Sequence, residues 1–253
     1  MSTLKFMITS GSFRWRAAVN TAVIIGFAIG GLQAACQSIS VVPVNVLLAP
    51  GQTTATLTVK NQSDQETAIQ IRPYLWSQPD GQDQLKPTLA VIISPPIAMI
   101  PAGGSQLVRL LLKQPPTDKE ATYRILLDQL PPPAQPGTVH VVFRLSIPIF
   151  ARPVARVLAH VQFHVEYEGG QLYLVGRNDG TRHEAVREIS LLTSGGRSLK
   201  AESGSSPYIL AGVTRRWHIT APDFVPLANE TFKLTSRMDS GPIEEQIHVI
   251  PKP

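Results

Sequence analysis

Polar and apolar residues alternate with a period of two along most of the chain that follows residue 37. The segments 54–59 and 67–71 show this alternation most clearly, and it is typical of strands that bury one face. Clusters of Pro, Gly, Asn and Asp separate the apolar runs, so a turn is predicted about every 8–12 residues. About seven short strands with such turns indicate an immunoglobulin-like β-sandwich. The later runs that predict strands in this first set are 89–93, 107–112, 123–127 and 139–150.

A second set of short strands is predicted after residue 154. Helical spacing occurs there only weakly, around residues 183–192. The chain is therefore predicted to be all-β, with two domains at 37–152 and 153–253 that are hinged near residues 151–157. The runs of the second set are 161–167, 172–176, 186–192, 208–210, 217–219, 232–235 and 243–249.

The first 36 residues have the pattern of an export signal. Three basic residues precede the apolar run 17–32, and small residues follow it at positions 34–36. This order is that of a cleaved secretory signal peptide. We predict that residues 1–36 are removed and that the mature protein starts near Gln37, outside the cytoplasm. Two alternatives stay open, an uncleaved membrane anchor and a lipid-modified Cys36.

Composition excludes several classes of protein. A single cysteine excludes an intrachain disulfide and a multi-cysteine metal site. The 22 prolines argue against long helices, because proline lacks the backbone N–H that a helix needs. After residue 36 the chain has 20 basic and 18 acidic side chains, a balance too even to suggest a nucleic-acid partner.

The sequence contains no convincing catalytic or metal-binding pattern. His160 and His164 have a spacing that suits a metal on a helix. On the predicted strand four residues span about 13 Å, which is too far for two ligands of one ion. The Gly-Ser turns at 194–196 and 204–206 lack the flanking residues of a nucleophile elbow. We therefore predict neither an enzyme nor a cofactor.

The segment 139–150 is the longest predicted strand, and one of its faces is entirely apolar. Pro148 places it at the edge of a sheet, because a central strand could not lose a ladder hydrogen bond. Soluble proteins normally avoid a long apolar edge, since it promotes aggregation. Two interpretations fit equally well: a last strand packed wholly in its own core, or an edge on which a strand of another chain is added.

At this point the chain resembles the PapD-like periplasmic pilus chaperones. The resemblance covers about residues 38–250, and the order of its motifs is more specific than any one of them. The matching segments are VLLAPGQ (46–52), ATLTVKN (55–61), ISPP (93–96), IPAG (100–103), YRILLDQLP (123–131), IPIFARP (147–153), NDG (178–180) and ILAGVTRRW (209–217).

The resemblance implies two immunoglobulin-like domains in a boomerang arrangement, with a subunit-binding cleft between them. In this family the last strand of the first domain, here about residues 138–150, lends alternate apolar side chains to an incomplete pilus subunit. Carried over by position, these side chains are Val139, Val141, Phe143, Leu145 and Ile147.

The family also uses an Arg and a Lys to anchor the carboxylate of the subunit. The matching positions here are Asn45 and Pro148, and neither is cationic. Anchoring therefore differs in this chain, or a nearby base such as Arg144 or Arg152 replaces the family's pair. Arg152 matches the family arginine that stabilises the domain joint, and Asp128 is a candidate for its ion-pair partner.

The function implied by the resemblance is that of a periplasmic chaperone of the chaperone–usher pathway. Such a protein binds pilus subunits by donor-strand complementation, prevents their premature polymerisation and delivers them to an outer-membrane usher. It needs no cofactor, metal, nucleic acid or small-molecule substrate. A structural or adhesive extracytoplasmic protein built of immunoglobulin-like domains is the alternative.

Overall fold

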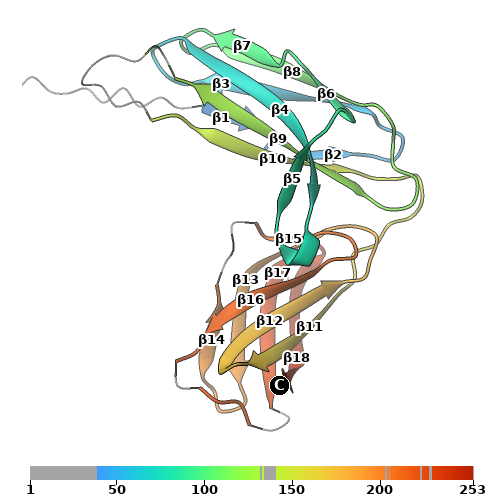
Figure 1. Cartoon of the computed structure of the whole chain (residues 1–253), viewed down its shortest axis with the longest axis vertical. Coiled ribbons are helices and arrows are strands. Elements are labelled where there is room, and N and C mark those ends of the chain that lie inside the picture. The colour runs from blue at the N-terminus through green and yellow to red at the C-terminus, as the bar shows by residue number, and fades with distance from the viewer. Residues whose placement is uncertain are drawn as a thin grey trace, which may run out of the picture. The chain divides into compact units, whose positions relative to one another are not determined.

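The computed structural model describes residues 39–131, 133, 141–202, 204, 206–222, 224–227 and 230–252. The predicted signal peptide and Val139 lie outside these residues. Within them the regular structure is β-strand apart from one 3-10 turn, η1 (Pro79–Gly81), so the all-β prediction is confirmed (Figure 1). No helix of this described part is long and apolar enough to cross a membrane.

The first sandwich consists of two sheets. One sheet has the strand order β1-β3-β8-β6, and the other has the order β2-β10-β9-β4-β5, with β7 paired to β4. Every pairing is antiparallel except that of β2 with β10, which is parallel. The strands are β1 (Ile39–Val42), β2 (Val46–Leu48), β3 (Thr54–Asn61), β4 (Thr67–Ser77), β5 (Gln84–Pro87), β6 (Val91–Ser94), β7 (Ile97–Ile100), β8 (Ser105–Leu112), β9 (Ala121–Leu130) and β10 (Arg144–Ala151).

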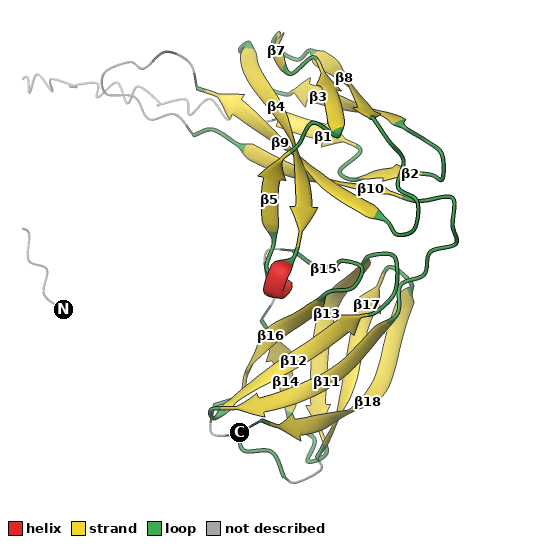
Figure 2. Cartoon of the chain, turned by 45° about the vertical axis from the view of Figure 1, so that its right-hand side comes forward, coloured by secondary structure: helices red, strands yellow, loops and turns green. Residues whose placement is uncertain are grey.

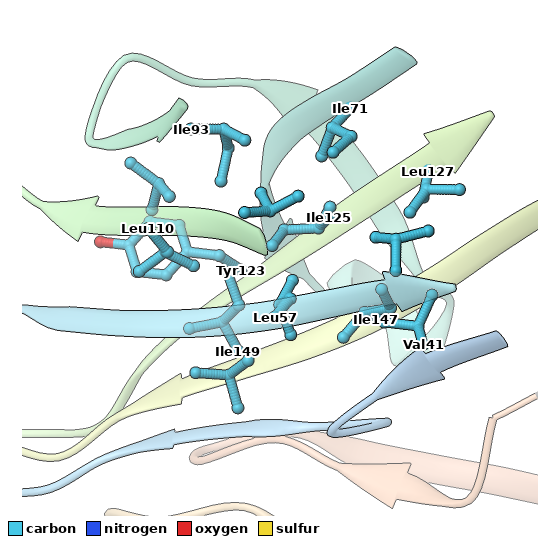
Figure 3. Close-up of a cluster of buried hydrophobic side chains, with 14 of the residues drawn as sticks. Val41, Leu57, Ile71, Ile93, Leu110, Tyr123, Ile125, Leu127, Ile147 and Ile149 are labelled. Carbon is cyan, nitrogen blue, oxygen red and sulfur yellow. The ribbon is translucent and has the colours of Figure 1, made fainter. Parts of the chain in front are cut away.

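The alternation of the sequence decides which side chains form the core of this sandwich. On β3, Leu57 and Val59 are 1% and 0% exposed, while Thr56 and Thr58, which alternate with them, are exposed. Figure 3 shows Leu57 in the same cluster as side chains from both sheets. Burying each such side chain contributes roughly 1.5–3 kcal/mol, so the pattern that predicts the strands also holds the sheets together.

The second sandwich has its own core, formed by residues between Val165 and Val249. Its strands follow the order β14-β16-β12-β11-β18-β17-β13-β15, and β14 also pairs with β13. The last strand, β18, runs parallel to the first, β11, over a short stretch. The strands are β11 (Val161–Glu168), β12 (Gln171–Asn178), β13 (Glu184–Thr193), β14 (Ser198–Ala201), β15 (Tyr208–Ile209), β16 (Thr214–Thr220), β17 (Thr231–Met238) and β18 (Gly241–Pro251).

A hairpin connects the two cores, which belong to one compact unit, Ala35–Pro253. Figure 2 shows η1 in red at the tip of the β4–β5 hairpin. The side chain of Gln78, next to η1, accepts a hydrogen bond from the Leu210 N–H (2.9 Å) and donates one to the Tyr208 carbonyl (2.9 Å). Trp76, Phe150 and Leu210 form a small third core beside it. The hairpin therefore supplies both polar and apolar contacts to the joint.

Gly81 lets the tip of the hairpin approach β16 closely. Its φ is +74°, a conformation that L side chains rarely adopt. A Cβ atom at this position would lie 2.7 Å from the carbonyl oxygen of Thr214. Any larger residue must therefore push the hairpin away from the second sandwich.

We expect Gly81→Ala to lower the free energy of unfolding by more than Gly51→Ala does. Gly51 has a similar φ of +77° but nothing within 4 Å of its Cβ position, so it reports the backbone strain alone. That strain costs about 1–2 kcal/mol, and the clash at Gly81 should add roughly 1–3 kcal/mol. Urea denaturation of the two variants measures the difference. Equal losses would mean that the hairpin yields without cost to the joint.

Candidate docking site on a free strand edge

The last strand of the first sandwich lacks a partner along part of one side. β10 pairs with β9 along its whole length, from Arg144 to Ala151. On its other side it pairs with β2 only at residues 149–151. Within the described part of the chain no strand covers that side at residues 144–148. We call this stretch the free edge.

Two hydrogen bonds show which backbone groups point to the free edge. The Gln129 N–H donates to the Phe143 carbonyl (2.9 Å), so odd-numbered residues face β9. The Arg152 N–H donates to the Leu48 carbonyl (3.0 Å), so even-numbered residues face β2 and the free edge. Arg144 and Ser146 thus direct N–H and C=O groups outward. Pro148 occupies an even position, where its missing N–H costs no hydrogen bond.

The odd-numbered apolar side chains of this segment pass from the core into solvent. Ile149 and Ile147, both labelled in Figure 3, are 0% and 3% exposed. Leu145 is half-buried, Phe143 is 43% exposed and Val141 is 68% exposed. The alternation continues beyond the point where the sandwich can cover it. These side chains therefore form an apolar row that its own domain does not bury.

The two interpretations of the segment 139–150, a core strand or a docking edge, apply to different parts of it. Ile147 belongs to the core of its own sandwich, as a last strand should. Val141 and Phe143 precede β10, which begins at Arg144 and not at residue 139 as predicted. Among the described residues, the Gln129 N–H to Phe143 carbonyl bond continues the ladder there. That these side chains bind another chain stays a prediction, and Val139 lies outside the described residues.

The last strand of the second sandwich also lacks a described partner on one side. β18 pairs with β11 only at residues 249–251. Glu245 shares the row of Ile247 and Val249 by alternation but is itself exposed, and partial burial raises its pKa above the usual value. A charge in this row of an open edge discourages the addition of another strand. The edge of β10 has no such charge in its odd-numbered row.

Asn45 and Pro148 lie side by side at the end of the free edge. The pairing of Val46 with Ile149 places Asn45, one residue earlier, beside Pro148. Asn45 is exposed, whereas Pro148 is buried. Arg124 lies opposite Pro148 on β9 and is the nearest cation by strand register. The sequence does not single out Arg124, because only the strand register reveals that it faces Pro148.

The charge of Arg124 is compensated. Its guanidinium lies 3.1 Å from the carboxylate of Asp83 and 3.9 Å from the ring centroid of Trp76. It also donates hydrogen bonds to the hydroxyls of Ser146 and Ser206, each at 3.1 Å. Burial lowers the pKa of Arg124, and the charge of Asp83 opposes this effect. Arg124 therefore serves mainly to bind the free-edge strand, the hairpin and the second sandwich together.

The predicted ion pair between Asp128 and Arg152 is wrong. The carboxylate of Asp128 bonds instead to Arg72 (2.5 Å) and to Arg144. Register explains the error: Asp128 pairs with Arg144, and Arg152 lies eight residues, roughly 26 Å, further along the strand. Arg152 itself is half-buried, and its Nε has no hydrogen-bond partner.

Glu120 and His183 join the two sandwiches through a buried side-chain contact. The Oε2 atom of Glu120 lies 2.5 Å from His183 Nδ1 and also accepts the backbone N–H of His183 (3.0 Å). The ring of Phe150, on β10, stacks on His183 with a centroid distance of 3.5 Å. No sequence signal points to these residues, because a Glu before a strand and a lone His are both common.

The two histidines of the rejected metal pattern have separate partners. His160 bonds to Asp179 (2.5 Å) and His164 to Glu166 (3.3 Å). No group of three or more potential metal ligands occurs among the residues that the structure describes.

Comparison with known proteins gives a consistent picture. Residues 38–156 match the family described as "Pili and flagellar-assembly chaperone, PapD N-terminal domain". A "Probable fimbrial chaperone EcpB" of Klebsiella pneumoniae is 25% identical over 205 residues, which are 76% of this chain and 86% of the relative. The protein of the same name from an Escherichia coli strain is 26% identical over 194 residues, or 72% and 81% of the two chains.

Solved structures share the fold. A chain of the CsuC-CsuE chaperone–tip adhesion subunit complex of Acinetobacter baumannii superposes with a TM-score of 0.61 and 22% identity, covering 85% of this chain and all of that one. A chain of the complex of Salmonella enterica SafA pilin with the SafB chaperone superposes with a TM-score of 0.56 and 17% identity. The match covers 83% of this chain and 95% of that one. At these identities the likeness concerns the fold.

We expect the Asp128 cluster to stabilise the first sandwich in a pH-dependent way. Burial raises the pKa of Asp128, but hydrogen bonds from Arg144 and Arg72 outweigh it, so the pKa lies below its usual value. The charged carboxylate therefore stabilises the fold above about pH 4, and this contribution disappears as the pH falls through the lowered pKa.

Urea denaturation of Asp128→Asn and the wild type measures this effect. At neutral pH the substitution should cost about 1 kcal/mol, a modest value because both arginines are largely solvated. The difference should vanish near pH 2. A loss of the same size at both pH values would show that packing of the amide, and not the lost charge, is responsible.

Proposed function

We propose that this chain, which matches the PapD N-terminal domain family over residues 38–156 and is similar to fimbrial chaperones, binds fimbrial subunits in the periplasm through the free edge of β10. It prevents their premature polymerisation and delivers them to an outer-membrane usher. The observation that carries this proposal is the apolar row that leaves the core at Leu145, Phe143 and Val141 beside unpaired backbone groups.

Strand addition uses both features of this edge. The outward N–H and C=O groups of Arg144 and Ser146 offer hydrogen bonds to any incoming strand. Val141 and Phe143 are 68% and 43% exposed, and each contributes roughly 1.5–3 kcal/mol when a partner buries it. The backbone bonds supply general affinity, and the spacing of the side chains selects a partner with a matching apolar groove.

The mechanism consists of one strand exchange and needs no cofactor or nucleotide. A subunit that lacks a strand exposes an apolar groove, which the segment 141–147 fills. While the groove is filled, another subunit cannot insert its own segment, and polymerisation is blocked. At the usher a neighbouring subunit then replaces the chaperone strand.

We expect the double substitution Val141→Asp with Phe143→Asp to abolish recovery of a fimbrial subunit from the periplasm. Two charges in place of two buried apolar groups should reduce the affinity at least a hundredfold. Copurification of the subunit with tagged chaperone, and the Tm of the free chaperone, are the measurements.

Val142→Asp is the matched control, because Val142 is 43% exposed but belongs to the opposite row. It should retain most of the bound subunit. If the double variant unfolds while the control does not, the row serves the chaperone's own core. If both variants bind as the wild type does, strand addition takes place elsewhere.

We also propose that Arg152 supplies positive potential for the end of the subunit. It has no ion-pair partner among the described residues, whereas Arg124 is compensated by Asp83. Subunit affinity should then fall about threefold to tenfold between low and high salt, and Arg152→Gln should remove that dependence. Arg152→Lys should keep it, because lysine retains the charge and loses only the fork geometry. If the subunit affinity of the wild type and of both Arg152 variants does not depend on salt, strand addition is the sole source of affinity.

A further inference from the structure

The free edge ends at a proline. Pro148 is the last residue of β10 before the stretch that pairs with β2. Its nitrogen faces the open side, as those of Arg144 and Ser146 do, but it has no N–H to donate. A strand added to this edge can therefore make full ladder bonds at residues 144 and 146 but finds no N–H donor at 148.

The space beyond Pro148 is already occupied. β2 pairs with residues 149–151, so an added strand and β2 lie in line along the same side of β10. Asn45, one residue before β2, is exposed at the meeting point. Its amide can donate a hydrogen bond to a carbonyl or carboxylate and accept one from an N–H. The two residues at the boundary of the free edge, Asn45 and Pro148, therefore carry no charge.

Building on the proposed function, we propose that Pro148 and Asn45 form a stop that sets the register of the bound subunit strand. A strand on this edge can slip only in steps of two residues, because a single step would turn its apolar side chains to the wrong face. Because proline has no N–H, a shift of the added strand by two residues toward β2 gains no hydrogen bond at position 148. The strand then halts where Val141, Phe143 and Leu145 meet the groove of the subunit.

Cross-linking can test this register directly. The probe is the fimbrial subunit that copurifies with the chaperone, with single cysteines placed along its pairing strand. The chaperone carries Ser146→Cys, an exposed position of the free edge, and its own Cys36 lies in the predicted signal peptide. Disulfides form only between close positions, with Cα atoms about 5.5–6 Å apart, so they report which residues are paired.

We expect a single subunit position to cross-link to the thiol introduced by Ser146→Cys when Pro148 is present. With Pro148→Val, which restores the N–H, the cross-link should shift by two residues or divide between two positions two residues apart. Pro148→Ala is the second variant, for use if valine prevents folding. The matched control is Pro73→Val on β4. Pro73 faces the opposite border of the same sheet, as Ile71 does through its bond to the Pro96 carbonyl (2.8 Å).

The possible outcomes are distinct. A shift with the Pro148 variants and none with Pro73→Val supports the stop. An unchanged cross-link in the Pro148 variants overturns it and leaves the proposed function intact, since the strand still binds at this edge. Absence of a cross-link at any position of the subunit strand, in a complex that still forms, overturns the proposed function and the stop together.

Discussion

The rest of the site depends on one constraint, the change of sheet that the chain makes between β1 and β2. β1 pairs with β3 in one sheet, and β2 pairs with β10 in the other. Because β2 is only three residues long, it covers β10 at residues 149–151 and leaves the preceding residues without a partner. A longer β2 would close the sandwich and remove the free edge. The exposed apolar row and Pro148 can contact an added strand only because this side of β10 is open.

The base of the same strand is held far more firmly than its free part. Phe150 is fully buried among Trp76, Leu210 and the ring of His183. The buried pair of Glu120 with His183 lies beside it and joins the start of β9 to the second sandwich. Breaking this contact is costly, because a buried polar group would be left without its hydrogen-bond partner. The strand is thus anchored at one end and uncovered at the other, which suits an element that exchanges partners.

The sequence predicts most strands of both cores, but not the short strands β1, β2, β5, β7 and β14 and not the contacts between the cores. Alternation at Thr54–Asn61 is decisive, because one face is buried and a shift of one residue would expose Leu57 and Val59. The pairing of Asp128 was predicted wrongly because it depends on strand register, which alternation does not determine. Arg124 and His183 were missed for a related reason: their partners are 41 and 63 residues away and carry no local pattern. Local periodicity specifies elements, whereas the joint and the end of the edge arise from long-range packing.

The contrast between the two last strands explains why an aggregation hazard is retained at one place only. β18 and β10 have equivalent positions, each pairing in parallel with an early strand of its sandwich over three residues. In β18 the row of Ile247 and Val249 contains Glu245, whose pKa is raised by partial burial, and this charge makes the open edge a poor template. In β10 and the residues just before it, the corresponding row runs from Ile149 to Val141 without a charge, although Phe143 and Val141 reach solvent. An edge that is charged in one domain and apolar in the other reflects different requirements on the same architecture, solubility in the second sandwich and a partner strand in the first.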